Sequence, residues 1–224
     1  MDAQPFLLTF ELAFISTCVL FVVALPLAYW LAYSHQRFKV IVEAIVALPI
    51  VLPPSVLGFY LLILLSPEKN LGGWLARHFD LRLVFTFPGL VVASIIYSLP
   101  FMVQPIQTGF QQLPGSLREA SYTLGKGTMT TLFRVLLPNM KTSLLTGSIL
   151  AFAHTIGEFG VVLMVGGNIP GETRVLSLAI YDEVESMNYE SANMYSLVLL
   201  AFTFVVLVTV YYFNHHQRRK IDLL

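Results

Sequence analysis

The sequence predicts an all-α polytopic membrane helix bundle with five transmembrane helices, and three observations support this fold class. Of the 224 residues, 56% are hydrophobic and only 12% are charged, about half of the roughly 25% charged residues typical of soluble domains. The mean hydropathy is +0.74. Five stretches reach the ~20 predominantly apolar residues that a helix needs to cross a bilayer.

The five predicted spans follow one another without long linkers, repeats or low-complexity tracts. They cover residues 12–34, 44–66, about 88–109, 142 to about 165, and 191–214. Between the last two spans, the apolar stretch 175–181 is too short to cross the bilayer, so we expect a short interfacial helix there.

The distribution of lysine and arginine predicts the orientation, because cytoplasmic loops of membrane proteins carry an excess of both. With the carboxyl end inside, the inner segments hold Arg37, Lys39, Arg118, Lys126, Arg134, Lys141, Arg218, Arg219 and Lys220, whereas the outer segments hold Lys69, Arg77, Arg82 and Arg174. We therefore expect a multi-pass protein of the inner membrane, with its amino terminus outside and the tail 214–224 in the cytoplasm. The last outer loop is acidic, which makes it a polar surface suited to a partner.

Helix-breaking residues cluster in the second predicted span: Pro49, Pro53, Pro54 and Gly58. Proline within a helix removes one backbone donor and frees a carbonyl one turn earlier. At membrane depth such defects are tolerated only where they are buried in protein or line a wet cavity. We interpret the cluster as part of a transport pathway or a hinge, with an ordinary helix kink as the alternative.

The fourth predicted span contains the only charged residue within any of the five, Glu158. His154 lies four residues earlier, so a continuous helix would place both side chains on one face. A carboxylate in the membrane is unfavourable and usually faces the bundle interior or a cavity. Gly157 and Gly160 permit close helix packing. We interpret these four residues as a gate or a helix–helix latch; the alternative is a structural ion pair or hydrogen bond with no role in passage.

Several chemical functions lack their residues in this sequence. The run Gly125-Lys126-Gly127-Thr128 lacks the form of an ATP-binding P-loop, so we do not expect the chain to hydrolyse ATP or to be an enzyme. Cys18 is the single cysteine, and His215-His216 lies in the polar tail. We therefore expect no metal site and no cofactor. No lysine or arginine lies within a predicted span, which favours a low-affinity passage over a tight anion site.

The inner loop 111–141 carries the most specific pattern. We expect a short helix over 117–124 that ends at Gly125, a favourable residue just past a helix end, and a second helix over 129–137 that stops at Pro138. The loop reads Glu119-Ala120-Ser121, then Gly125, Val135 and Leu137-Pro138. This spacing resembles the signature E-A-A-x3-G-x9-I-x-L-P of binding-protein-dependent ABC importer permeases, with Ser for the second Ala and Val for Ile.

The resemblance implies a type I ABC importer permease fold over residues 9–213. It also implies that the loop 111–141 couples the permease to a separate ATPase subunit, with the glycine allowing a turn and the acidic residue meeting the partner.

A second resemblance concerns the substrate. The runs Gly157-Glu158-Phe159-Gly160 and G-G-N-I-P-G-E-T (166–173), together with LPIVLPPSVLGFYLL (48–62), are similar to the molybdate permease subgroup. Members of that subgroup often have arginine where His154 stands. The resemblance implies import of molybdate, with tungstate close in size and charge. The expected partners are a second permease copy, two ATPase copies, membrane lipid and an extracytoplasmic oxyanion-binding protein, and no nucleic acid. Direct anion contact by Glu158 is disfavoured, because a carboxylate repels an oxyanion.

Three alternatives stay open. A permease for sulfate or another oxyanion shares the G-E-[FY]-G core, but the N-I-P-G-E-T run argues against sulfate. An ion-coupled secondary carrier would not need the spaced coupling loop. An intramembrane enzyme would need a polar constellation within the spans, where only His154 and Glu158 are available.

Overall fold

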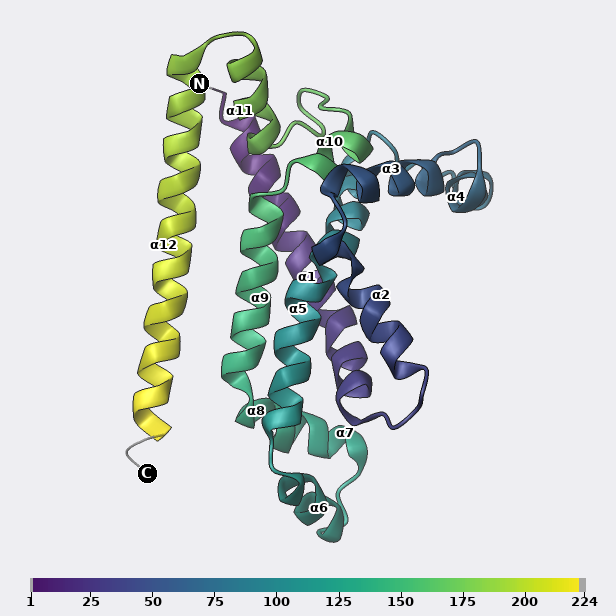
Figure 1. The fold of residues 1–224 in the computed structure, drawn as a ribbon, viewed down its shortest axis with the longest axis vertical. Helices are drawn as coiled ribbons and strands as arrows, with labels where there is room; N and C mark the ends of the chain where they lie inside the picture. The colour runs from purple at the N-terminus through teal and green to yellow at the C-terminus, as the bar shows by residue number, and fades with distance from the viewer. Residues whose placement is uncertain (1, 222–224) are drawn as a thin grey trace.

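The computed structural model describes residues 2–221 and shows an elongated bundle of helices (Figure 1). Three helices are long and apolar enough to cross a membrane: α1 (Gln4–Tyr33), α5 (Phe87–Gln112), and the part of α12 (Tyr189–Ile221) that covers Tyr189–Thr209. They confirm the first, third and fifth predicted spans. The three run in the same direction along the bundle (Figure 1), as alternate crossings must.

The second predicted span is not one straight helix, because it is bent at Pro53 and Pro54, two of the helix breakers noted in the sequence. It forms α2 (Lys39–Val51) and α3 (Pro54–Leu65), which meet at 115°. Leu52 and Pro53 have extended backbones, with ψ of 137° and 136°. Each of these two residues precedes a proline, and proline disfavours the helical conformation in the residue before it. The α3 helix therefore turns aside, and with α4 (Asn70–Phe79) it projects from the bundle (Figure 1).

The fourth predicted span is broken as well. Helix α9 (Lys141–Ile156) ends before Glu158, and the short α10 (Gly160–Gly166) follows. The prediction of a helix from 142 to about 165 is therefore wrong at 157–159. The break lies against the start of α3: a Cβ atom on Gly160 would come within 2.7 Å of Pro54 Cβ, and one on Gly58 within 2.8 Å of Met164 Cβ. The two glycines thus allow α3 and α10 to pack closely.

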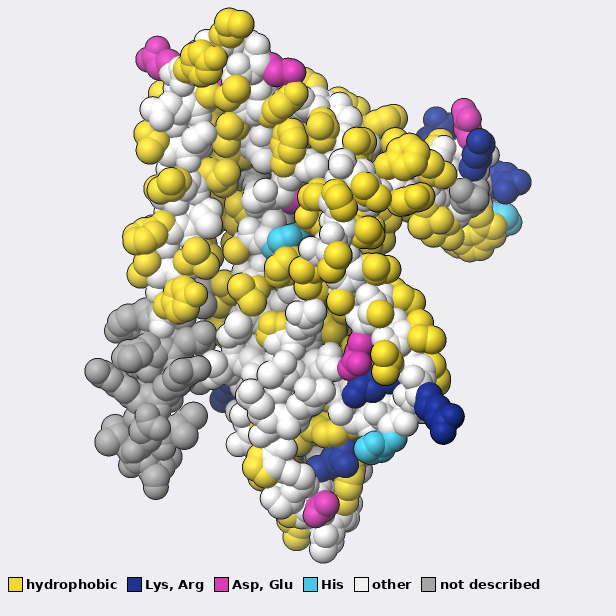
Figure 2. Space-filling model, in the orientation of Figure 1, with side chains coloured by type: hydrophobic (Ala, Val, Ile, Leu, Met, Phe, Trp, Pro, Cys, Tyr) yellow, Lys and Arg dark blue, Asp and Glu magenta, His cyan; other side chains and the backbone are white. Residues whose placement is uncertain are grey.

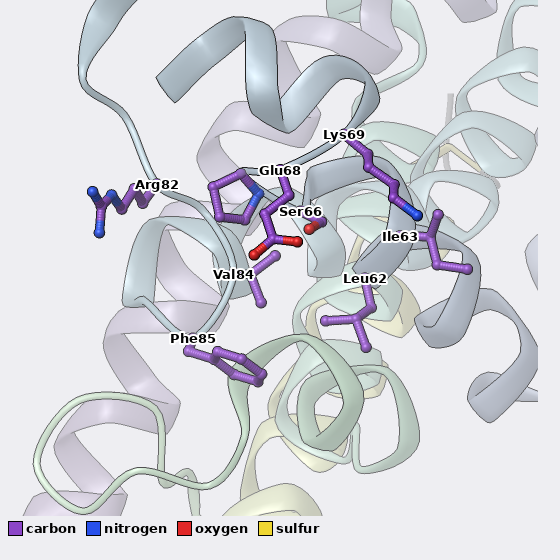
Figure 3. A pocket seen from close by; sticks show the side chains of 9 residues that line it. Leu62, Ile63, Ser66, Glu68, Lys69, Arg82, Val84 and Phe85 are labelled. Carbon is purple, nitrogen blue, oxygen red and sulfur yellow. The ribbon is translucent and has the colours of Figure 1, made fainter. Parts of the chain in front are cut away.

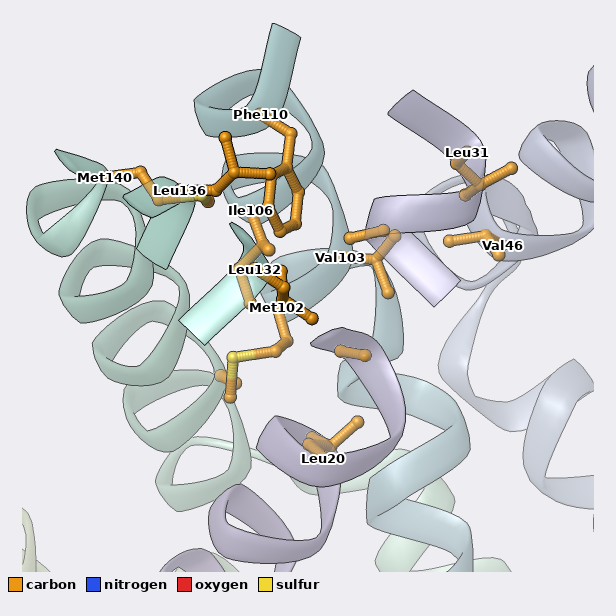
Figure 4. Close-up of a cluster of buried hydrophobic side chains, with 13 residues drawn as sticks. Leu20, Leu31, Val46, Met102, Val103, Ile106, Phe110, Leu132, Leu136 and Met140 are labelled. Carbon is orange, nitrogen blue, oxygen red and sulfur yellow. The ribbon is translucent and has the colours of Figure 1, made fainter. Parts of the chain in front are cut away.

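The largest buried cluster of apolar side chains includes residues of the inner loop (Figure 4). It joins α1 and α5 to residues from the inner loop, and it includes Leu20, Leu31, Val103, Ile106, Phe110, Leu132 and Leu136. Dense side-chain contact, more than burial from water, holds helices together within a membrane. The inner loop is therefore packed on the bundle through part of its second helical segment.

The inner loop folds into four short elements at one end of the bundle (Figure 1). They are α6 (Gly115–Thr123), α7 (Thr128–Thr131), a π-helical turn (Leu132–Leu136) and α8 (Leu137–Asn139). Both predicted helices of the loop are confirmed, although the second contains the wide turn and extends one residue past Pro138. At the other end of the bundle, α11 (Leu176–Glu185) confirms the short helix expected near 175–181.

Candidate functional site

The turn after α6 has the geometry of a Schellman motif. Gly125 has φ of +71°, its N–H donates to the carbonyl of Tyr122 at 2.9 Å, and the N–H of Lys126 donates to the carbonyl of Ser121 at 3.1 Å. A side chain on Gly125 would have open space around it. Glycine is thus favoured here by backbone conformation, because only glycine adopts positive φ without strain. The predicted end of this helix at Gly125 is confirmed.

Ser121 replaces the second alanine of the signature and has a partner of its own. Its hydroxyl lies 2.8 Å from that of Thr131, and both side chains are buried. This hydrogen bond joins α6 to α7 across the turn. The substitution therefore adds a polar contact that fixes the angle between the two helical segments.

Some of the other signature residues lie on the side of the loop that packs against the bundle, and the rest lie on its exposed side. Val135 and Leu137 are partly buried, whereas Glu119, Ala120 and Pro138 are exposed. Three large apolar side chains are also exposed on the same loop: Leu124, Met129 and Phe133. The outer side thus combines an acidic residue with apolar side chains, a composition suited to docking a protein partner.

A cluster of aromatic residues and one arginine ties α6 to the spans. The guanidinium carbon of Arg118 lies 4.4 Å from the ring centroid of Tyr33, near the end of α1. The Tyr33 hydroxyl donates to the Phe110 carbonyl in α5 at 3.1 Å. A cation–π contact of this kind contributes about 0.5–1 kcal/mol at an exposed site. These two contacts join α6 to α1 and, through Tyr33, to α5.

The Glu158 region forms hydrogen bonds with α5. Ser94 donates to Glu158 Oε2 at 3.0 Å, and the Ser98 hydroxyl lies 2.9 Å from His154 Nδ1. The expected shared face of His154 and Glu158 is wrong, because α9 ends at Ile156. The four-residue spacing that matters is that of Ser94 and Ser98 on α5. Neither serine was predicted, although two hydroxyls one turn apart in an apolar span are a detectable signal.

A pocket of about 540 Å³ opens beside this cluster. Its lining comprises Pro54, Ser55, Tyr97, Ala153, His154, Gly157, Glu158, Phe159 and Gly160. The structure thus brings together five predicted residues from the two broken spans. Pro49 and Pro53 are not among the lining residues, and Gly58 packs on α10 instead.

Within this pocket Glu158 is 4% exposed, and its Oε1 has no hydrogen-bond partner among the described residues. His154 stacks on the ring of Phe101, with 3.9 Å between centroids. One carboxylate oxygen of Glu158 is therefore hydrogen-bonded to α5.

A larger groove of about 720 Å³ lies between α5 and α9, toward the inner loop. Its polar lining residues are Gln104, Thr108, Gln112, Asn139, Thr142, Ser143 and Thr146, and the described lining contains no lysine or arginine. In Figure 2 a broad white area of uncharged polar side chains and backbone covers this face over the lower halves of α5 and α9. None of these residues was predicted, although Gln104, Thr108 and Gln112 recur every four residues and so share one helix face.

Removing the carboxylate charge should separate the two interpretations of Glu158. If the Ser94–Glu158 contact is a latch, Glu158→Gln and Ser94→Ala should each leave membrane abundance and ATPase recruitment intact but alter basal hydrolysis or transport. The effects should be non-additive in the double variant, because both substitutions act on one hydrogen bond worth about 1 kcal/mol. ATPase and uptake assays on the three variants test this. Glu11→Gln, at an exposed position of α1, is the matched control. Unchanged behaviour of all three variants would show that Glu158 has only a structural role.

Comparison with known proteins places the chain in a family. It is similar to the molybdenum transport system permease protein ModB of Azotobacter vinelandii, with 47% identity over 94% of this chain and 93% of that protein. It is also similar to the sulfate transport system permease protein CysT of Escherichia coli K12, with 32% identity over 88% of this chain and 71% of that protein.

Among solved structures, the inward-facing MetNI methionine ABC transporter aligns with a TM-score of 0.70 and 18% identity, covering 93% of this chain and 92% of that chain. This likeness supports the ABC importer permease fold. The family described as "Binding-protein-dependent transport system inner membrane component" matches residues 24–222. Since that match spans most of its length, the chain belongs to the family of binding-protein-dependent transport system inner membrane components.

Proposed function

We propose that this chain is the membrane-spanning permease subunit of an ATP-driven importer of molybdate, with tungstate as a second substrate. Identity to the molybdenum permease relative is 47%, against 32% for the sulfate permease relative. The N-I-P-G-E-T run supports the same choice, since it lies in the loop directly after α10 and the Glu158 pocket. The proposal excludes an enzymatic role for this chain, because ATP hydrolysis would belong to a separate subunit.

The observation that carries this proposal is the neutral polar groove between α5 and α9. Hydroxyl and amide groups on the outside of a membrane bundle are unfavourable against lipid. A second copy of the chain, facing groove to groove, would cover them and enclose a passage. Such a lining offers hydrogen-bond donors to an oxyanion without a fixed cation, so the anion is held weakly enough to leave again. Selectivity would then belong to a soluble binding protein.

The partners follow from the two ends of the bundle. The exposed side of the inner loop, with Glu119, Leu124 and Met129, suits docking on an ATPase subunit, one copy for each chain of the dimer. That assignment places the inner loop and carboxyl end in the cytoplasm and the amino terminus outside. The acidic surface around α11 then faces the binding protein.

We further propose that the pocket around Glu158 is the gate of the passage. It lies where the breaks in α2–α3 and α9–α10 meet, and breaks allow the short segments to move without bending a continuous helix. The Ser94–Glu158 hydrogen bond would hold the present conformation. The free oxygen of Glu158 gives the carboxylate a position for a second hydrogen bond in the other conformation.

Reconstitution of the full complex tests the proposal. The chain and its ATPase are placed in sealed vesicles, and binding protein loaded with molybdate, tungstate or sulfate is added. Molybdate- and tungstate-loaded protein should stimulate hydrolysis, whereas sulfate-loaded protein should not. Stimulation of hydrolysis by sulfate-loaded protein alone would favour a sulfate permease. If no loaded protein stimulated hydrolysis, the assignment of the chain to an importer would be contradicted. The experiment also checks orientation, because ATP and the loaded protein should act from opposite sides of the vesicle.

A further inference from the structure

A second pocket lies away from the groove and the gate, on the projecting arm formed by α3 and α4. Its volume is about 620 Å³, and it is lined by the end of α3, the loop that follows it, and the loop that leads into α5 (Figure 3). The lining residues are Leu62, Ile63, Ser66, Pro67, Glu68, Lys69, Arg82, Val84 and Phe85. Neither the coupling loop nor the proposed passage uses any of them.

Three charged side chains of alternating sign surround this pocket. In Figure 3 the Glu68 carboxylate points into the pocket above Val84, with Lys69 on one side and Arg82 on the other. Within the described part of the chain, the ion pairs join Lys39 to Glu43 and Arg174 to Asp182. The pocket charges are therefore not neutralised by one another, and they are arranged with the anion in the centre and a cation at each side.

The remaining walls are apolar and include a constrained aromatic ring. Phe85 has φ of +63°, a conformation that is uncommon for a bulky residue and persists only where the surroundings hold it. Its N–H donates to the Val165 carbonyl at 2.9 Å. Gly167 leaves room for the ring, since a Cβ atom there would lie 2.6 Å from Phe85 Cδ1. Even so, Phe85 stays 47% exposed and presents part of its ring to the pocket.

The arm itself has the composition of an element at the membrane–water interface. Tyr60, Leu64, Leu71, Trp74 and Phe79 are exposed on it. In Figure 2 hydrophobic side chains cover the lower side of the arm and charged side chains gather at its tip. Tyrosine and tryptophan are enriched at the level of lipid headgroups. The pocket also adjoins the start of α5, a helix long and apolar enough to cross a membrane, so it lies near one end of that span.

We propose that this pocket binds an aminophospholipid of the phosphatidylethanolamine type. The ammonium group donates hydrogen bonds to Glu68, and the phosphate lies against Lys69 or Arg82. The acyl chains follow Leu62 and Ile63 toward the bilayer. A transported oxyanion does not fit, because the central carboxylate repels it. A choline headgroup cannot donate hydrogen bonds to Glu68, and an anionic headgroup leaves Glu68 without a partner.

Native mass spectrometry of the full chain in detergent tests this site, with phosphatidylethanolamine, phosphatidylcholine and phosphatidylglycerol titrated separately. Phosphatidylethanolamine should bind most tightly. Glu68→Gln should weaken that binding about tenfold, since it removes one charge-assisted hydrogen bond. Glu68→Lys should reverse the preference toward phosphatidylglycerol. Asp80→Asn, which removes a carboxylate from the same arm outside the pocket, should change neither affinity nor preference.

Two results would overturn the proposal. One is equal affinity for the three lipids in the unsubstituted chain. The other is a Glu68→Gln variant that binds phosphatidylethanolamine as tightly as the Asp80→Asn control does. If Glu68→Gln instead weakened association of two chains while lipid binding stayed constant, the arm would be a contact between copies and the lipid site would be rejected. None of these readouts depends on transport, so failure here is distinguishable from failure of the proposed function.

Discussion

Replacing Gly125 with valine should uncouple transport from ATP hydrolysis while leaving the membrane bundle assembled. The residue has φ of +71°, and a β-branched side chain in that conformation costs on the order of 1–3 kcal/mol. The strain would be relieved by opening the turn, which changes the angle between α6 and α7 and breaks the Ser121–Thr131 hydrogen bond. We expect normal abundance, weakened ATPase recruitment, and hydrolysis that the loaded binding protein no longer stimulates.

The chain offers a close control for this substitution. Gly127 lies two residues away, also has open space around it, and has an extended backbone with φ of −73° and ψ of 166°. Gly127→Val adds the same side chain to the same loop without the backbone strain, so it should retain coupling. Recruitment is measured by co-purification and coupling by stimulated hydrolysis in vesicles. If Gly125→Val recruits the ATPase and transports like Gly127→Val, the proposed role of this turn is wrong.

Placing a cation in the groove should make the groove bind the transported anion tightly and so slow release of the anion. Gln104→Lys introduces an ammonium group among hydroxyl and amide side chains. Two unit charges 4 Å apart attract by about 4 kcal/mol at an effective dielectric constant of 20, and a dianion doubles that value. Retention of as little as ~1.4 kcal/mol of this attraction slows release tenfold. We expect uptake to fall about tenfold or more, with ATPase recruitment unchanged and molybdate bound to the purified variant.

Gln36→Lys is the matched control, because Gln36 is also an exposed glutamine but lies outside both the groove and the loop 111–141. It should transport normally and retain no molybdate. Gln104→Glu should also slow uptake, by repulsion, yet leave no bound anion. Normal uptake by both Gln104 variants would show that the groove is not the passage.

The features that local sequence determines were predictable. Long apolar runs identified α1, α5 and α12, and the spacing from Glu119 to Pro138 identified the inner loop with its turn at Gly125. The prolines also marked where the second span breaks, whereas the break in the fourth span was not predicted. The bend of 115° between α2 and α3 was not predictable, because a proline pair ends a helix without fixing the direction of the next one. That direction depends on the packing of Gly58 against α10.

The polar contacts between spans could not be predicted from the sequence, for a related reason. Glu158 was identifiable because a charge in an apolar run is conspicuous, but its partner Ser94 is 64 residues away along the chain. A serine in a span is as compatible with a helix-internal hydrogen bond as with a contact to another helix. The groove residues share this ambiguity. Only the packing of α5 beside α9 brings Gln104 and Thr108 together with Thr142.

The contact of Arg118 with Tyr33 has a consequence for engineering the partner choice of such permeases. The spaced signature begins at Glu119, so an exchange of that segment between two relatives would leave both aromatic partners behind. The grafted loop would then pack against the α1 end of the recipient protein. Its angle to the bundle would differ from that in the donor, even with every signature residue present. If the loop docks on an ATPase as proposed, the smallest transferable module for that recognition is therefore discontinuous: residues 111–141 together with Tyr33 and Phe110.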